Sequence, residues 1–317
     1  MRAVRYHDHG GTDVLTLEEA DRPEPGPEEL LVRVEAAGIN PVDTYFREGS
    51  YPLPELPWIP GSDAAGEVAA VGDSVEAFAV GDRVYATSLG REEQGTCAEY
   101  VAVPAELAAP LPDAVEYDAA AALALVGTTA WQAFVDHGEV APGDEVLVHG
   151  GNGGVGHIAV QLARAMGATV TATAAPEYHD RLRSLGAEHV VDYARDDLTD
   201  AIGSVATPDV ILGTVANQTI ATDAEVAADR GRIVAIGNTE PTVAVPMGPG
   251  KFNDLRFQAM SMFNTPDTGD VLGKLAGLVA RDDVEPVIAE RYGLDGVAEA
   301  HQTVVGESFL GKLVVEP

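Results

Sequence analysis

Hydrophobic and polar positions in the first 120 residues follow the short alternating pattern of β-strands. Residues 30–35 alternate, and residues 65–71 and 83–87 are rich in small and β-branched apolar side chains. Turn signals separate these segments at Gly61, Gly72 and Gly81. The N-terminal part of the chain is therefore predicted to be mostly β.

The pattern changes between residues 120 and 236, where short apolar segments alternate with segments of helical period. The predicted strands are residues 145–149, 169–173, 189–191, 210–212 and 232–236, and the predicted helices are residues 155–165, 178–185 and 219–228. Parallel strands need a crossover connection, which these helices supply. The alternation therefore predicts a doubly wound α/β domain.

Beyond about residue 265 the chain mixes one amphipathic helix, residues 271–280, with further strands that end at residues 312–315. A tail of about 50 residues makes a poor independent core, so we assign it to the N-terminal domain. A chain of 317 residues that is 46% hydrophobic has material for two packed domains. We predict one domain from residues 1–121 with 265–317, and a second from residues 122–264.

The longest apolar run, residues 119–126, is much shorter than the roughly 18 residues of a membrane-spanning helix. Charges throughout residues 1–13 argue against a signal peptide. We therefore expect a soluble, cytoplasmic protein.

Acidic residues dominate the charge balance. The chain has 51 Asp and Glu against 19 Lys and Arg, a formal net charge of −32. Such a chain repels nucleic acid and anionic membrane surfaces. Because the acidity is spread along the whole length, we favour adaptation to a very salty cytoplasm over an acidic mesophilic protein.

Cys97 is the only cysteine, which excludes an internal disulfide and a cysteine-rich zinc site. Its surroundings, residues 96–101, have the pattern of a strand. We expect a buried small hydrophobic residue rather than a nucleophile.

A glycine-rich turn between a predicted strand and a predicted helix is the most informative motif. Its G-x-G-x-x-G spacing is formed by Gly151, Asn152, Gly153, Gly154, Val155 and Gly156. Glycines let the backbone turn sharply and approach a pyrophosphate, whose oxygens bind free N–H groups at the start of the helix. In this strand–turn–helix context the motif predicts a dinucleotide site, and the alternative is a loop with packing duties only.

The end of the second predicted strand bears on which dinucleotide binds. NAD sites usually place Asp or Glu there to bind the ribose 2′-hydroxyl, but this strand ends at Thr173 without an acid. His179 and Arg181 follow and could face a 2′-phosphate, although both could equally be solvated helix residues. Glu177 and Asp180 lie among them and weaken the inference. NADP(H) is therefore favoured over NAD(H).

These motifs together resemble the medium-chain dehydrogenase/reductase superfamily, in its zinc-free quinone oxidoreductase (ζ-crystallin-like) branch. The resemblance covers essentially the whole chain and rests, besides the glycine turn, on AGINPVDTY at residues 37–45, PGSDAAG at 60–66, VGDRV at 80–84, GTTAW at 127–131 and GKLVV at 311–315. It implies a discontinuous GroES-like, mostly-β catalytic domain, an inserted Rossmann domain and a cofactor cleft between them. It also implies a homodimer or homotetramer built on Rossmann edge strands.

The resemblance also allows zinc to be examined residue by residue. Alcohol dehydrogenases of this superfamily ligate catalytic zinc with a Cys and a His, and the matching positions here are Asn40 and Ser62. Neither is a useful zinc ligand, and the eight histidines show no ligand spacing. We therefore expect no metal.

Without a Lewis acid, direct alcohol oxidation loses the group that would stabilise an alkoxide, whereas hydride transfer to an electrophilic acceptor stays feasible. The resemblance implies that Asn40, Tyr45 and Tyr51 face the acceptor, with Tyr45 stacking on it or hydrogen-bonding to it and Asn40 as the amide donor. The alternative is that both tyrosines only pack between the strands and the loop of residues 52–57.

The resemblance extends to further cofactor residues. Besides the strand-end Thr173, they are Thr129, Val215, Gly237, Asn238 and Phe263 near the nicotinamide, Tyr193 near the adenosine phosphate, and Lys312 on the pyrophosphate side. The sequence departs from some relatives at Val126, where they have a lysine, and at Gly213, where they have an acidic residue, and both departures bear on the polarity of the substrate pocket.

The sequence therefore predicts an enzyme that transfers hydride from NADPH to a quinone. The alternatives are an NADPH-dependent reductase of enones or enoyl thioesters, and a non-catalytic NADPH-binding protein. A CoA thioester would require a basic patch, for which this chain offers few candidates, among them Arg47 and Arg91.

Overall fold

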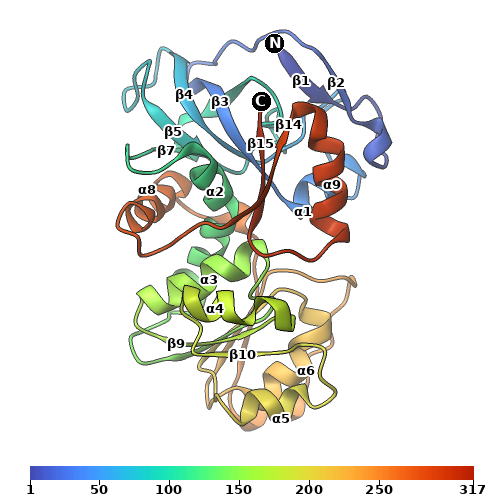
Figure 1. The fold of residues 1–317 in the computed structure, drawn as a ribbon, viewed down its shortest axis with the longest axis vertical. Helices are drawn as coiled ribbons and strands as arrows, with labels where there is room; N and C mark the ends of the chain where they lie inside the picture. Colours follow the sequence, from blue (N-terminus) through green and yellow to red (C-terminus); the bar gives the residue numbers. More distant parts are fainter. The chain divides into compact units, whose positions relative to one another are not determined.

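The computed structural model describes all residues from Met1 to Pro317. The chain divides into two compact units. Unit 1 comprises Met1–Thr128, Pro266–Asp282 and Pro286–Pro317, and thus contains both ends of the chain, drawn blue and red in Figure 1. Unit 2 comprises Thr129–Thr265 and Asp283–Glu285.

Unit 1 is built on a seven-stranded sheet with the order β14-β15-β3-β4-β5-β7, in which β6 also pairs with β3. All of these pairs are antiparallel except β14 with β15. The strands are β3 (Glu29–Ile39), β4 (Asp63–Val71), β5 (Arg83–Ala86), β6 (Tyr100–Pro104), β7 (Ala108–Pro110), β14 (Ile288–Gly293) and β15 (Lys312–Glu316). A separate two-stranded sheet pairs β1 (Arg2–Arg5) with β2 (Thr16–Glu19).

Four helices belong to unit 1: α1 (Pro41–Arg47), α2 (Tyr117–Trp131, ending just past the boundary at Thr128), α8 (Thr268–Val279) and α9 (Val297–Gly306). The main core combines apolar side chains from β3, β4, β5, β15 and α9. Helix α1 follows β3 directly, and Asn40 between them caps the helix. The capping box explains why the strand turns into a helix at this residue: the Asn40 and Asp43 side chains accept the N–H groups that have no partner in the helix.

Unit 2 is a six-stranded, all-parallel sheet with the order β10-β9-β8-β11-β12-β13. The strands are β8 (Glu145–Val148), β9 (Thr169–Thr173), β10 (His189–Val191), β11 (Val210–Gly213), β12 (Arg232–Ala235) and β13 (Arg256–Ala259). The helices are α3 (Gly154–Ala165), α4 (His179–Leu185), α5 (Leu198–Gly203), α6 (Ala216–Val226) and α7 (Met247–Phe252). The strand order reverses between β8 and β11, which is the switch point of a doubly wound fold. The predicted fold class is thereby confirmed.

Two local expectations differ from the structure. Cys97 lies outside any strand, since β6 begins only at Tyr100, yet its side chain is fully buried. The tail contains a second helix, α9, where only strands were expected beside the helix at 271–280.

One helical stretch, Tyr117–His137, is long and apolar enough to cross a membrane by length and composition alone. It joins α2 to a π-helical turn, η3 (Gln132–His137), and so extends well beyond the apolar run at residues 119–126. In the fold, 78% of its most apolar window is buried, as in the core helix of a protein without membrane spans. It is weak evidence for a membrane segment.

Candidate functional site

The glycine-rich turn of unit 2 connects β8 to α3 at the switch point of the sheet. Gly150 has a positive φ of 64°, and Gly153 directly precedes the helix. A Cβ on Gly156 would lie 2.1 Å from the carbonyl oxygen of Gly150, so no side chain fits there. The twelve-residue helix α3 directs its free N–H groups and the positive end of its dipole toward this turn. This geometry suits a pyrophosphate.

Thr173 ends β9 beside the turn and is almost fully buried. Its hydroxyl oxygen accepts a hydrogen bond of 3.2 Å from the Gly150 N–H. Ala174 and Ala175 follow, so no carboxylate stands at the end of β9, and the first acidic residue is Glu177 in the next turn. The usual acceptor for a ribose 2′-hydroxyl is therefore missing from this strand end.

The candidates for a 2′-phosphate have protein partners of their own. The His179 imidazole donates through Nε2 to the carbonyl oxygen of Ala174 at 3.0 Å. Arg181 pairs with Glu285 over 2.6 Å and is only partly buried, so a phosphate would compete with that carboxylate. Tyr193 follows β10 and is about half exposed.

The remaining cofactor candidates of unit 2 follow the ends of other strands, apart from Thr129, which is buried in α2. Val215 comes after β11, Gly237 and Asn238 come after β12, and Phe263 lies in a 3₁₀ turn after β13. Parallel strands bring these loops to one edge of the sheet, the edge that also holds the glycine turn. A Cβ on Gly237 would lie 2.4 Å from the Thr214 carbonyl oxygen, which shows how closely two of the loops approach.

In unit 1, Tyr45 on α1 and Tyr51 just beyond it form an aromatic pair. Their ring centroids lie 5.9 Å apart at an interplanar angle of 74°. Both side chains are between one-third and one-half exposed, so a ligand can reach them. Partial burial raises the pKa of Tyr45, and the neighbouring Tyr51 and Glu48 raise it further, so its hydroxyl stays protonated and able to donate.

Asn40 is fully buried, and its amide is already bonded within the protein. Its Nδ2 donates to Asp63 Oδ2 at 2.8 Å, and its Oδ1 accepts from Lys312 Nζ at 2.5 Å. Its backbone N–H donates to the Asp43 carboxylate at 2.8 Å. The sequence predicts this amide as a donor to the acceptor, whereas the structure uses it to connect β3, β4 and β15.

Lys312 lies in unit 1, with its ammonium group buried against the end of β3. It donates to the Ile39 carbonyl oxygen at 2.6 Å and lies 4.0 Å from Asp63 Oδ2. Burial lowers the pKa of Lys312, and the charges of Asp63 and Asp43 oppose that shift. Its place on the pyrophosphate side stays a prediction, and within its own unit this lysine balances buried carboxylates.

Sequence reasoning missed the two carboxylates of this cluster, Asp43 and Asp63. Burial raises the pKa of Asp43 to about 7, although hydrogen bonds from Ser62 and the Asn40 backbone lower it. Burial also raises the pKa of Asp63, with Lys312 opposing the shift. Both acids lie inside motifs that carry the family resemblance: Asp43 is three residues after Asn40, and Asp63 is one residue after Ser62. Their place in these motifs could have pointed to them.

Asn40 and Ser62, the two positions that match zinc ligands in alcohol dehydrogenases, are both hydrogen-bonded to the buried carboxylates Asp43 and Asp63. Ser62 Oγ donates to Asp43 Oδ1 at 2.6 Å, and Asn40 is bonded as described. No group of three or more His, Cys, Asp or Glu side chains in the chain is placed to hold a metal ion. The donor set here therefore does not fit a catalytic zinc.

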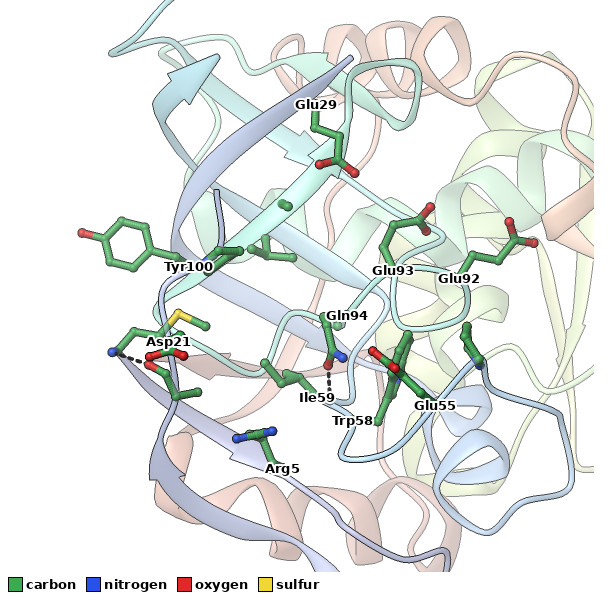
Figure 2. A pocket seen from close by; sticks show the side chains of 17 residues that line it. Arg5, Asp21, Glu29, Glu55, Trp58, Ile59, Glu92, Glu93, Gln94 and Tyr100 are labelled. Atoms are coloured by element: carbon green, nitrogen blue, oxygen red, sulfur yellow. Dashed lines mark hydrogen bonds between the residues drawn. The ribbon is translucent and has the colours of Figure 1, made fainter. Parts of the chain in front are cut away.

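Unit 1 also contains a cavity of about 470 Å³, shown in Figure 2. Its charged lining is mostly acidic: Asp21, Glu29, Glu55, Glu92 and Glu93 outnumber Arg5 and the N-terminal ammonium of Met1. Burial raises the pKa of Glu93, and Glu92 and Glu29 raise it further. None of the predicted site residues lines this cavity, and its charge would repel an anionic nucleotide.

Comparison with known proteins agrees with this architecture. Two families match: "Alcohol dehydrogenase GroES-like domain" over residues 26–113 and "Zinc-binding dehydrogenase" over residues 185–315. The chain is 34% identical to a quinone oxidoreductase of Mus musculus, across 99% of this chain and 97% of that protein.

Solved structures resemble it over their whole length. An NAD-dependent alcohol dehydrogenase aligns with a TM-score of 0.92 at 31% identity, with both chains fully covered. The Escherichia coli quinone oxidoreductase complexed with NADPH aligns with a TM-score of 0.90 at 29% identity, again with both chains fully covered. The chain belongs to the quinone oxidoreductase branch of the medium-chain dehydrogenase/reductase superfamily.

Proposed function

We propose that this protein reduces quinones with NADPH, without a metal ion. The observation that carries the proposal is the glycine turn of unit 2, where the carbonyl oxygen of Gly150 excludes any side chain at residue 156. When bound, NADPH would supply a hydride, and a quinone accepts one readily because its conjugated carbonyls delocalise the added electrons. A proton taken up on oxygen completes the hydroquinone. The names of the relatives support this choice of substrate.

We assign the acceptor to the exposed pair Tyr45 and Tyr51. Either ring can stack on a flat acceptor, and the Tyr45 hydroxyl, kept protonated by its raised pKa, can donate to the acceptor oxygen. Asn40 acts in this proposal by capping α1, which holds Tyr45 in place.

For the cofactor, we assign the pyrophosphate to residues 151–156 and the nicotinamide end to Thr129, Val215, Gly237, Asn238 and Phe263. Two features support NADPH rather than NADH. No carboxylate stands at the end of β9 to bind a ribose 2′-hydroxyl. His179 and Arg181 on α4, together with Tyr193, could face a 2′-phosphate. Release of Arg181 from Glu285 would free a guanidinium for the 2′-phosphate.

We also propose a salty cytoplasm as the protein's surroundings and a homodimer or homotetramer as its assembly. The net charge of −32 supports the first. For the second, β13 is an edge strand with only β12 as neighbour, and Phe252, on the helix just before it, is 90% exposed. Light scattering in concentrated KCl would give the oligomer size.

The proposal is tested by the initial rate of NADPH oxidation, beside that of NADH, in multimolar KCl with one ortho-quinone and one simple enone. Quinone-dependent oxidation of NADPH is the expected result. Turnover of the enone alone would replace the proposal with an enone reductase. Tight NADPH binding without turnover of either acceptor would replace it with a non-catalytic binding protein.

A further inference from the structure

A line of buried polar side chains lies behind the glycine turn and belongs to none of the predicted sites except through Thr173. His149 directly follows β8 at the start of the turn, and its two ring nitrogens have different partners. Nδ1 lies 3.1 Å from Thr173 Oγ1, and Nε2 lies 2.7 Å from Asp223 Oδ1 on α6. All three residues are at most 2% exposed.

The direction of this line starts from Asp223, because a carboxylate oxygen only accepts, so His149 Nε2 donates to it. The Gly150 N–H donates to Thr173 Oγ1, so the Thr173 hydroxyl hydrogen is free to point at His149 Nδ1. Nδ1 then accepts, and the ring hydrogen on Nε2 points at the Asp223 carboxylate. The other oxygen of Asp223 accepts from Thr219 Oγ1 at 3.0 Å. Every partner is satisfied when His149 is neutral with its hydrogen on Nε2.

Burying these three polar side chains costs free energy, because each loses its hydrogen bonds to water. A carboxylate at 0% exposure is tolerated only when hydrogen bonds replace its lost water. None of the three side chains is exposed enough to touch a substrate. Besides Thr219 on α6, the three side chains bond to the backbone N–H of Gly150, a residue whose carbonyl oxygen excludes a Cβ at Gly156. The line therefore ends on the residue that shapes the phosphate-binding turn.

We propose that Asp223, His149 and Thr173 form a positioning line that fixes the orientation of the Gly150 peptide and thereby sets the affinity for the cofactor pyrophosphate. Thr173, predicted to contact the cofactor, acts in this way through the turn. Asp223 determines which atom donates in each hydrogen bond of the line, because its carboxylate requires a hydrogen on His149 Nε2. The inference rests on the proposed dinucleotide site, but not on the acceptor or on the choice between NADPH and NADH.

The first test compares Thr173→Val with Thr171→Val. Both replace a buried threonine of β9 by an isosteric valine, and the two residues lie on the same face of the strand, but only Thr173 bonds to the turn. Dissociation constants for NADPH and for NADH are measured by nucleotide fluorescence in concentrated KCl, with circular dichroism to confirm folding. We expect Thr173→Val to weaken both nucleotides by about tenfold, because a buried N–H loses its acceptor, and Thr171→Val to weaken neither by more than about twofold.

Equal loss for the two nucleotides is the decisive feature, since they share the pyrophosphate and differ at the 2′-position. A loss confined to NADPH would mean that Thr173 touches the 2′-phosphate itself, and equal affinities of the two variants would mean that the line does not act on the turn. Either result overturns the proposal. The quinone and enone rates report separately on the proposed function.

The second test is spectroscopic and does not need the cofactor. The ¹⁵N chemical shifts of the His149 ring, assigned by comparison with His149→Gln, should show a neutral ring with hydrogen on Nε2 at neutral pH. Asp223→Asn, which offers both an acceptor and a donor, should weaken that preference. A wild-type ring with hydrogen on Nδ1, or on both nitrogens, would contradict the assigned direction.

Discussion

The ammonium group of Lys312 donates a hydrogen bond of 2.5 Å to the side-chain oxygen of Asn40, a residue 272 positions earlier in the chain. This contact joins the last strand of unit 1 to the residue that caps α1, and α1 carries Tyr45. The same ammonium is the nearest cation to the buried Asp63. Lys312 therefore both balances the buried charge of Asp63 and supports the cap of the helix that holds Tyr45.

Lys312→Met should destabilise the protein by about 3–5 kcal/mol, because it leaves Asp63 buried without a cation. Urea unfolding in concentrated KCl measures the loss. Lys274→Met is the matched control, since Lys274 forms an exposed pair with Asp270 on α8, and should cost less than about 0.5 kcal/mol. Equal losses for the two variants would show that Lys312 does not balance the buried charge.

Asp43 should make the free energy of unfolding fall as the pH rises from about 4 to 7. Burial raises the pKa of Asp43 to about 7 in the folded protein, against 3.8 for an unperturbed carboxyl. Since the folded state holds this proton more tightly, its stabilising effect is complete below about pH 4 and disappears as the pH passes 7.

Asp43→Asn should remove this dependence, lowering the slope of unfolding free energy between pH 4 and 7 by up to about 1.4 kcal/mol per pH unit. Asn can still accept from the Asn40 N–H while its amide donates to Ser62, whose hydroxyl can turn to accept. Urea unfolding of both proteins at several pH values and one KCl concentration gives the two slopes. Parallel curves would rule out titration of Asp43 in this range.

Gly156→Ala should abolish measurable dinucleotide binding, because its Cβ would collide with the Gly150 carbonyl oxygen at 2.1 Å. Fluorescence titration with NADPH measures the effect. Gly203→Ala, at the end of α5, is the control, since a Cβ there meets nothing within 4 Å. Wild-type affinity in Gly156→Ala would move the phosphate away from this turn.

Tyr45→Phe should lower kcat for a quinone by about tenfold while leaving the dissociation constant of NADPH unchanged, because only the donor to the acceptor is removed. Tyr100→Phe, on β6 beneath the Arg22 guanidinium, is the control and should retain wild-type rates. Wild-type turnover by Tyr45→Phe would remove this hydroxyl from the mechanism.

Low salt should destabilise the protein. At a net charge of −32 the folded chain repels itself, and salt at about 1 M shortens the screening length to about 3 Å. We expect the thermal midpoint to drop by about 10 °C or more between 2 M and 0.1 M KCl, measured by circular dichroism. An unchanged midpoint would indicate an acidic protein without salt adaptation.

Local sequence patterns located most elements of unit 2, although β13, α5 and α7 were not predicted. Strands β9 and β10 have the predicted bounds, and α3 begins one residue earlier than predicted. Buried parallel strands give short, continuous apolar runs that crossover helices separate clearly. The glycine turn was equally visible because its spacing reflects a steric requirement within a few residues.

The polar networks could not be predicted in this way, because their partners are distant in sequence. His149 and Asp223 are 74 residues apart, and Lys312 reaches Asn40 only through the pairing of β15 with β3. Arg181 looked free to meet a phosphate, but it pairs with Glu285, 104 residues later. Such contacts depend on which elements pack together, and no local spacing encodes them.

The pairing of β15 with the end of β3 also bears on how the chain is made. At about 5–20 residues per second, a ribosome needs about 14 to 54 seconds to add the 272 residues that follow Asn40 up to Lys312. During that interval the last residues of β3 have an open edge, and Asn40 and Asp63 lack the Lys312 ammonium. Every strand of unit 2 is synthesised before the interval ends. Unit 2 can therefore fold first, and the nascent chain must keep the exposed edge of β3 from pairing with other strands until β15 arrives.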